Sequence, residues 1–297
     1  MQKHTFKDWL TAIRPWSFPA SAMPVAVTVG YLFSAHADID WTNGVWALLN
    51  IIVFHAAGNT WSDYFDFRKS VDADDTFGVR TLVSGQFAPK EILILSLALL
   101  AAALAGGIGL LLRTGLPLLY IGLAGAACSV FYPFLKYHAL GDFVIFAAYA
   151  FLPMLGTVYV CTLDFDWSVL YLAVPVGFIT VAILHCNNTR DMDTDRRADI
   201  STIAMRLGGR VSVWLYCIEI LLPYVWLTVC AVAGLFPLWT LLVWLTVIPA
   251  IMNVRTAVSY FSDGSGAIAR LDEATAKLQL LFSLVLGVSF VIAGLLG

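Results

Sequence analysis

Residues 91–112 read EILILSLALLAAALAGGIGLLL, an apolar run whose single charged residue stands at its start. A helix that crosses the hydrocarbon core of a bilayer needs about 20 mostly apolar residues, and it satisfies its backbone polar groups internally. A strand of a membrane barrel would instead alternate in polarity over about ten residues. The run therefore predicts a transmembrane helix.

The rest of the chain repeats this pattern. Hydrophobic residues make up 60% of the 297 residues and charged residues only 12%, and the mean hydropathy is +0.83. So little polar surface cannot cover a water-soluble core, which excludes a soluble enzyme, and the net charge of −3 gives no basis for a nucleic-acid partner. We expect an all-α, multi-pass membrane bundle of about nine transmembrane helices, in which residues 1–297 form a single membrane-embedded domain. The predicted spans lie near 16–36, 44–65, 91–112, 116–135, 141–161, 168–189, 211–233, 236–256 and 278–296.

The basic residues predict how this bundle lies in the membrane. With nine spans, every Lys and Arg except Arg113 falls in loops or flanks on one side. Because cytoplasmic loops are enriched in Lys and Arg, we expect the N-terminus in the cytoplasm and the C-terminus outside. The expected location is the inner (plasma) membrane of a bacterium, with the lipid bilayer as a partner of the whole chain.

Two clusters of carboxylates lie at the predicted cytoplasmic ends of the second and sixth spans. Each begins with an asparagine, continues with an aspartate four residues later, and has another aspartate three or four residues further on. The members are Asn59, Asp63 and Asp66 in the first cluster and Asn187, Asp191 and Asp195 in the second. These spacings place each set on one helix face, and the two sets are similar enough to suggest a weak internal repeat.

Paired carboxylate clusters of this kind are typical of a site for a hard divalent cation. Mg²⁺ takes oxygen ligands, usually one or two carboxylates together with substrate phosphates and water. Carboxylates packed this closely repel one another unless a cation relieves the repulsion, and neighbouring Arg and Lys favour a polyanionic ligand. Any single aspartate could be a solvated loop charge or a helix cap, but the repetition favours a Mg²⁺–diphosphate site that opens into a membrane cavity.

Three further ionisable residues lie deeper in the predicted spans. They are His55, His185 and Glu219. Charges in the bilayer core are costly and usually face a cavity or a partner. We expect the two histidines to be neutral, hydrogen-bonded packing residues, and Glu219 to pair between helices or to line a cavity.

Six stretches carry a family resemblance: RPWSFPAS at 14–21, DYFD at 63–66, RTLVSG at 80–85, LKYHALGD at 135–142, NNTRD at 187–191 and MRLG at 205–208. Together they resemble the UbiA superfamily of membrane-embedded aromatic prenyltransferases, and most closely the branch that prenylates 1,4-dihydroxy-2-naphthoate in menaquinone biosynthesis. The sequence departs from the pattern at two places. Ser62 stands where the family has Asn, and residues 199–202 read DIST where the branch usually has Gly-Lys-x-Thr, so that a lysine near the phosphate is missing.

The resemblance implies a nine-helix bundle in which two aspartate-rich motifs bind Mg²⁺ and a polyprenyl diphosphate. The polyprenyl group would alkylate a ring carbon of the aromatic acceptor, and in the naphthoate branch the ring carboxylate would leave as CO₂. The implied metal ligands are Asn59, Asp63, Asp66, Asp191 and Asp195. The implied catalytic set consists of these four aspartates and Asp142, which would orient the acceptor. The implied diphosphate contacts are Arg68, Arg80, Lys136 and Arg190.

Two alternatives stay open at this point. Another member of the superfamily would act on 4-hydroxybenzoate, haem, chlorophyll or a glycerol lipid. A membrane transporter would use the buried His and Glu residues as relays and the internal repeat as its two halves. The position of the acids at helix ends argues against a transporter, whose site belongs near the membrane midplane.

Overall fold

The computed structural model of the chain describes residues 4–35, 38–69, 81–197 and 200–296. Within these ranges the structure is helical, and the one β pairing is an isolated bridge between His138 and Ser201. The α-helices are α1 Phe6–Ile13, α2 Pro19–Ala35, α3 Trp41–Arg68, α4 Pro89–Thr114, α5 Pro117–Lys136, α6 Gly141–Phe146, α7 Leu152–Thr162, α8 Val169–Arg190, α9 Met192–Arg197, α10 Ile203–Leu207, α11 Gly209–Val232, α12 Val247–Val258, α13 Tyr260–Asp263 and α14 Leu271–Leu296. Four other helical segments join them: η1 Pro15–Ser17, the π-helical η2 Ala147–Phe151, η3 Leu238–Thr246 and η4 Gly264–Ile268. The all-α prediction is confirmed for the described residues.

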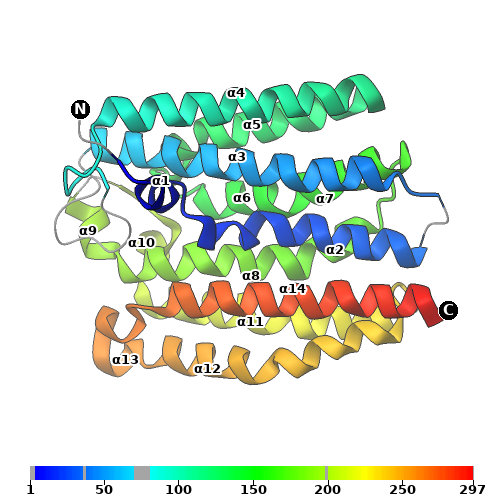
Figure 1. The fold of residues 1–297 in the computed structure, drawn as a ribbon. Coiled ribbons are helices and arrows are strands. Elements are labelled where there is room, and N and C mark those ends of the chain that lie inside the picture. The colour runs from blue at the N-terminus through cyan, green and yellow to red at the C-terminus, as the bar shows by residue number, and fades with distance from the viewer. Residues whose placement is uncertain (1–3, 36–37, 70–80, 198–199, 297) are drawn as a thin grey trace.

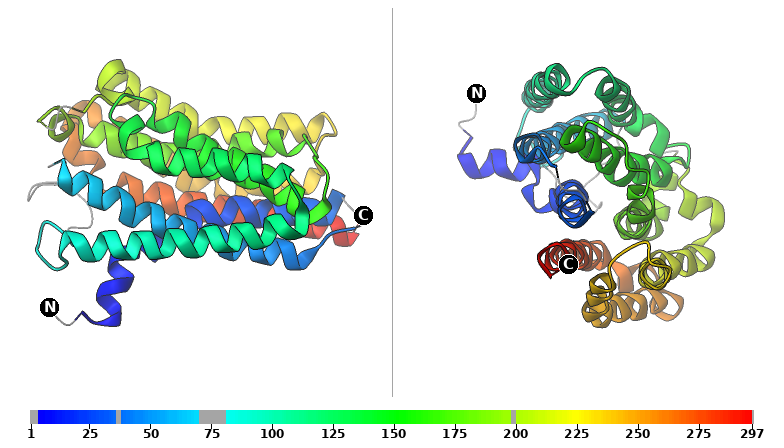
Figure 2. Two further views of the ribbon diagram at one scale, coloured as in Figure 1. Left: turned by 90° about the horizontal axis from the view of Figure 1, so that it is seen from above. Right: turned by 90° about the vertical axis from the view of Figure 1, so that its right-hand side faces the viewer.

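The long helices run side by side, and the short helices α1, α9, α10 and α13 gather at one end of the bundle (Figure 1). We call this the loop end. Seen end-on, the long helices form a curved array rather than flat layers (Figure 2). The two termini lie at opposite ends of the bundle (Figure 1).

The structure corrects the predicted number of spans. Six described segments are long and apolar enough to cross a membrane, and a seventh results if the helices of Phe6–Ser17 and Pro19–Ala35, bent by 51°, count as one span. The predicted spans 44–65 and 116–135 are helical but are not among them. In α3, polar side chains such as Asn43, Asn50 and His55 lower the hydropathy of the helix. In α5 the apolar part, Pro117–Tyr132, is short.

Burial separates inner from outer helices. In α8, 67% of the apolar stretch is buried, against 17% in α4. The outward faces are strongly apolar, and Leu97, Leu104 and Leu112 of α4 are exposed. Contiguous apolar surface of this kind would associate in water, so it fits a lipid environment. The chain is an integral membrane protein.

Local sequence fixes the helix starts and the turn that matters for the site. Asp40 accepts a hydrogen bond from the backbone N–H of Asn43 and caps α3, and Pro89 and Pro117 occupy first turns, where a missing N–H costs nothing. Arg14, between α1 and η1, has φ 53° and ψ 62°, a left-handed conformation that non-glycine residues rarely adopt. This turn directs the chain from α1 into α2 at the loop end.

Candidate active site at the loop end of the bundle

The two aspartate motifs lie at the same end of the molecule. The first occupies the last turns of α3, which ends at Arg68. The second begins on α8 and continues into α9, with a break at Asp191 (φ −94°, ψ 9°) that separates the two helices. The i→i+4 bonds continue through this break, because the N–H of Asp191 donates to Asn187 O and that of Asp195 donates to Asp191 O. The expected common face is therefore interrupted at one residue but not lost.

The first motif is joined to the turn at Arg14. The guanidinium of Arg14 forms an ion pair with Asp63 and also reaches the backbone oxygen of Asn59, at 3.4 Å. The amide nitrogen of Asn59 in turn donates to Ile13 O and to Ser17 Oγ, both at 3.0 Å. The sequence analysis predicted no role for Arg14, although this residue is the first of the stretch at 14–21 that resembles the family.

Asp66 joins the end of α3 to the end of α5. It is buried and accepts three hydrogen bonds: from Lys136 Nζ at 2.6 Å, from Tyr137 OH at 2.7 Å and from Ser62 Oγ at 3.1 Å. Ser62, which replaces the asparagine of the family pattern, is thus a donor to the motif. Lys136, predicted to contact diphosphate, lies beside the first motif.

The other predicted diphosphate contacts are placed differently. Arg190 forms two contacts of 2.7 Å with the carboxylate of Asp191, and it also lies 3.3 Å from Asp272 at the start of α14. Its guanidinium is therefore directed at carboxylates of the second motif and of α14. Arg68 is exposed at the end of α3. Arg80 lies outside the described residues.

The carboxylates of the two motifs approach one another at Asp195. The pKa of this carboxyl group is raised to about 7, first by burial and then by the nearby carboxylate of Asp191. The carboxylate of Asp66, from the first motif, acts in the same direction, and the Lys136 ammonium opposes it. Carboxylates this close together repel one another, so a bound cation would be strongly stabilised among them.

A cavity of about 290 Å³, which we call the chamber, is lined by Asn59 and Asp66 of the first motif and by Asn187 of the second. Asp63, Asp191 and Asp195 are not among the described residues that line it. Its polar lining includes Arg14, Asn59, Asp66, Lys136 and Asn187, and its aromatic lining includes Phe54, His55, Trp61, Tyr132 and Tyr149. Two buried polar atoms of this wall, Asn187 Oδ1 and Trp61 Nε1, have no hydrogen-bond partner in the described part of the chain. Buried polar atoms are normally paired, so the cavity is suited to a polar ligand.

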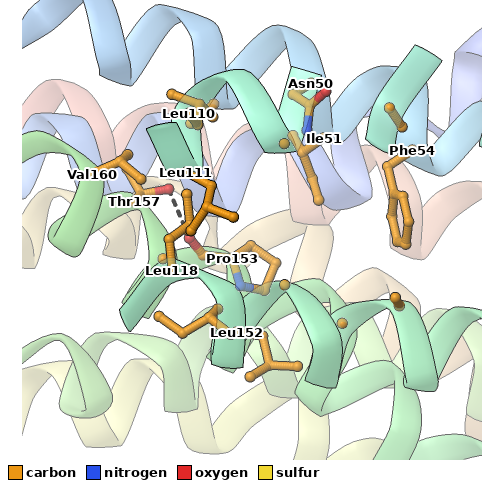
Figure 3. Close-up of a pocket in the computed structure, with 18 of the residues that line it drawn as sticks. Asn50, Ile51, Phe54, Leu110, Leu111, Leu118, Leu152, Pro153, Thr157 and Val160 are labelled. Atoms are coloured by element: carbon orange, nitrogen blue, oxygen red, sulfur yellow. Dashed lines mark hydrogen bonds between the residues drawn. The ribbon is translucent and has the colours of Figure 1, made fainter. Parts of the chain in front are cut away.

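A second cavity, of about 270 Å³, adjoins the first. The two share Ile51, Phe54 and Ala148. Side chains from α3, α4, α5 and α7 line it and are almost all apolar, and the hydroxyl of Thr157 is directed to Pro153 O at 2.7 Å (Figure 3). The site thus consists of a charged chamber followed by an apolar one.

The deeper ionisable residues lie in two places. His55 is buried between the hydroxyls of Ser17 and Ser21, as expected for a hydrogen-bonded packing residue. His185 is hydrogen-bonded to Asp142, and Glu219 pairs with it across α8 and α11, as expected for an interhelical pair. Asp142, at the start of α6, is thus attached to α8 through His185.

Comparisons with known proteins identify the family. The sequence model of the UbiA prenyltransferase family matches residues 23–285. UbiA prenyltransferase domain-containing protein 1 of Gallus gallus is 33% identical over 301 residues, covering 97% of this chain and 86% of that protein, and the Homo sapiens protein of the same name is 32% identical over 304 residues, covering 97% and 85%. A solved UbiA homolog from Archaeoglobus fulgidus bound to GPP and Mg²⁺ has a TM-score of 0.60 at 13% identity, covering 94% of this chain and 99% of that one.

Proposed function

The chain belongs to the UbiA prenyltransferase family, and we propose that this membrane prenyltransferase transfers a polyprenyl group from polyprenyl diphosphate to 1,4-dihydroxy-2-naphthoate in menaquinone biosynthesis. The proposal rests on one observation: residues of both motifs, Asn59, Asp66 and Asn187, line a chamber that adjoins an apolar cavity. A prenyl diphosphate has the same division into a charged head and an apolar tail. Because the chain belongs to a prenyltransferase family, the alternative that it is a membrane transporter is no longer proposed.

We propose Mg²⁺ as the cofactor, held by oxygens of the two motifs. The proposed ligands are Asn59, Asp63, Asp66, Asp191 and Asp195. The donor set fits, since Mg²⁺ prefers oxygen ligands and Asp195 lies among carboxylates that need a cation. When bound, Mg²⁺ would neutralise charge that develops on the leaving diphosphate.

The chain's own residues would complete the ionisation of the donor. Lys136 and Arg14 bring positive charge to the wall of the chamber, where the diphosphate would lie. Arg68, Arg80 and Arg190 remain proposed contacts from the loop end. The rings of Tyr132 and Tyr149 line the same chamber and would stabilise an allylic cation through their π faces while they exclude water.

The apolar cavity is the proposed site of the prenyl tail. It adjoins the chamber at Ile51, Phe54 and Ala148, so a donor with its head at the motifs would extend past these residues. The apolar lining of the cavity matches the apolar tail of the donor.

The acceptor and the orientation are also proposals. The stretches at 14–21, 80–85 and 187–191 support the naphthoate branch, in which loss of CO₂ restores aromaticity. Basic residues at the loop end, among them Lys136 and Arg190, support a cytoplasmic position of this end, with the N-terminus in the cytoplasm and the C-terminus outside. The relatives compared above are animal proteins, so the bacterial membrane remains a prediction from the sequence.

The test is a transfer assay with purified protein, Mg²⁺ and labelled geranyl diphosphate against a panel of acceptors. We expect a product of 1,4-dihydroxy-2-naphthoate that has gained the prenyl group and lost the mass of CO₂. A product that keeps its carboxylate, or transfer only to 4-hydroxybenzoate, would contradict the naphthoate branch. Transfer to none of the panel would contradict the proposed activity.

A further inference from the structure

Three ionisable side chains from three helices meet beside the chamber. His185 of α8 lies between Asp142 of α6 and Glu219 of α11, with its Nδ1 3.1 Å from Asp142 Oδ2 and 3.5 Å from Glu219 Oε1. All three residues are buried, and His185 is fully inaccessible. We call this set the buried triad.

The triad is short of positive charge. Within the described part of the chain, its recorded ion pairs are those between its own members. With both carboxylates ionised and the imidazole protonated, the set would carry a net negative charge inside the bundle, which is costly. Glu219 Oε2, moreover, has no hydrogen-bond partner among the described residues. The triad therefore favours a state that contains an additional proton.

The hydrogen bonds around His185 show which nitrogen of the imidazole ring carries a fixed proton and which one can exchange its proton. The hydroxyl of Thr189 donates to the backbone oxygen of His185 at 2.8 Å, so it can only accept from Ser212 Oγ, 2.5 Å away. Ser212 has then used its one hydrogen. Its contact of 2.8 Å with His185 Nε2 must be donated by the ring nitrogen. Nε2 thus carries a fixed proton, and the exchangeable one lies between Nδ1 and the two carboxylates.

Asp142 is the least buried member of the triad, and residues close to it in sequence line the chamber. Val144 and Ile145, in the next turn of α6, line the chamber, and so does Leu184, which precedes His185. Asp142 also interacts electrostatically with Tyr132 of the chamber wall. On the far side, Glu219 interacts with Tyr216 of α11 and Cys186 of α8, both of them buried. The triad thus leads from the chamber into the closed interior.

We propose that the buried triad is a proton relay for the acceptor, in which Asp142 is a catalytic base and His185 and Glu219 are positioning residues that hold the proton. The inference rests on the proposed function, because it assigns the proton of the acceptor's ring hydroxyl. Asp142 accepts this proton as the allylic carbon bonds to the carboxyl-bearing ring carbon. The hydroxyl becomes a ketone, and diphosphate leaves with the electron pair of its C–O bond.

The same relay returns the proton. The alkylated intermediate carries its carboxylate β to the new ketone, so its C–C bond breaks to give CO₂ and an enolate. The enolate oxygen takes back the proton that Asp142 holds, and the product is the prenylated diol. No net proton is gained or lost, so a store without a path to water is sufficient. A buried carboxylate–imidazole–carboxylate set has this property.

The test compares single-turnover rates of the full-length protein with geranyl diphosphate, Mg²⁺ and the naphthoate acceptor. Asp142→Asn, which keeps the size of the side chain, should slow transfer by about 10²-fold or more, the usual loss for a general base. Its affinity for geranyl diphosphate with Mg²⁺ should stay near that of the wild type. Ring-fluorinated acceptors, whose hydroxyls are more acidic, should recover part of the rate in Asp142→Asn.

The pH–rate profile of Glu219→Gln tests the positioning role of Glu219. Removal of this negative charge lowers the proton affinity of the remaining pair, so the acidic limb of the pH–rate profile should move to lower pH. A purely structural role would slow the reaction without moving that limb. An equal loss with every acceptor in Asp142→Asn, or an unmoved limb in Glu219→Gln, would overturn the relay.

Two measurements distinguish the proton relay from an error in the proposed acceptor and from a metal site. If wild-type protein transfers only to another phenolic acceptor, the proposed acceptor is wrong. The ratio of the transfer rates of Asp142→Asn and wild-type protein on that acceptor still shows whether Asp142 acts as a base. A stoichiometric transition metal that is present in wild-type protein and lost in Glu219→Gln would overturn the relay in favour of a metal site.

Discussion

Lys136 Nζ lies 2.6 Å from Asp66 Oδ2 and so joins the end of α5 to the first aspartate motif in the wall of the chamber. A cation that is held beside a carboxylate before any ligand binds is poised to interact with an anionic head group. The pair thus places positive charge next to the oxygens that we propose as metal ligands.

Lys136→Met should raise the KM for prenyl diphosphate by about tenfold to a hundredfold, because a hydrogen bond to a charged group contributes about 1.5–3 kcal/mol. Ser62→Ala is the matched control, since it removes a hydrogen bond to the same carboxylate but no charge. It should change KM by less than about fivefold. Steady-state kinetics at varied prenyl diphosphate concentration measure both KM values. Equal changes of KM in the two variants would contradict a role for the charge of Lys136.

Arg14→Gly separates backbone conformation from charge at the turn before α2. Glycine adopts the left-handed conformation of this residue without strain, so the melting temperature should change little. The ion pair with Asp63 is lost, and kcat/KM should fall by about tenfold or more. Thermal unfolding and kinetics on one preparation check both. Full activity in this variant would show that Arg14 does not act at the site.

The apparent affinity for Mg²⁺ should depend on pH through Asp195. The pKa of this carboxyl group, about 7, means that protons compete with the metal below neutrality. Affinity should rise by about tenfold per pH unit below the pKa and level off above it, because a metal ligand must be deprotonated. Asp195→Asn should bind Mg²⁺ more weakly but with a flatter pH dependence. Activity titrated with Mg²⁺ between pH ~5.5 and ~8 measures this slope.

Gly125→Leu should discriminate between donors by tail length. Gly125 lines the apolar cavity, and a Cβ atom added there meets no atom within 4 Å, so a larger side chain can begin there without a clash and would reduce the cavity. We expect KM to rise for long donors and to stay nearly unchanged for dimethylallyl diphosphate. Leu112→Phe, at an exposed position of α4, is the control for added bulk. An equal effect on short and long donors would place the tail elsewhere.

Much of the helical scaffold can be predicted from the sequence, because hydropathy and the 3.6-residue period are local signals. The faces carrying Asp63 and Asp191 follow from spacing alone. The number of spans was wrong for two reasons: polar side chains of α3, such as Asn50 and His55, lower the hydropathy of that helix, and the apolar part of α5 is short.

The partners of the site residues could not be predicted in the same way. The ion pair of Arg14 with Asp63 joins residues 49 positions apart through a left-handed turn that no periodicity indicates. The buried triad draws one residue from each of three helices. The sequence indicates its members separately, Asp142 through the LKYHALGD stretch and His185 and Glu219 through their place within apolar spans, but it does not show that they are partners.

The central claim is that the two aspartate motifs form one metal–diphosphate site, and a double-mutant cycle on Mg²⁺-dependent binding of a non-ionisable geranyl diphosphate analogue tests it most directly. We predict that Asp63→Asn and Asp191→Asn each weaken binding by about a hundredfold or more, and that the double variant loses less than the sum of the two, by about 1 kcal/mol or more, as expected for residues that act on one ligand. Losses that add to within about 0.5 kcal/mol, or one substitution that leaves Mg²⁺-dependent binding unchanged, would contradict a shared site.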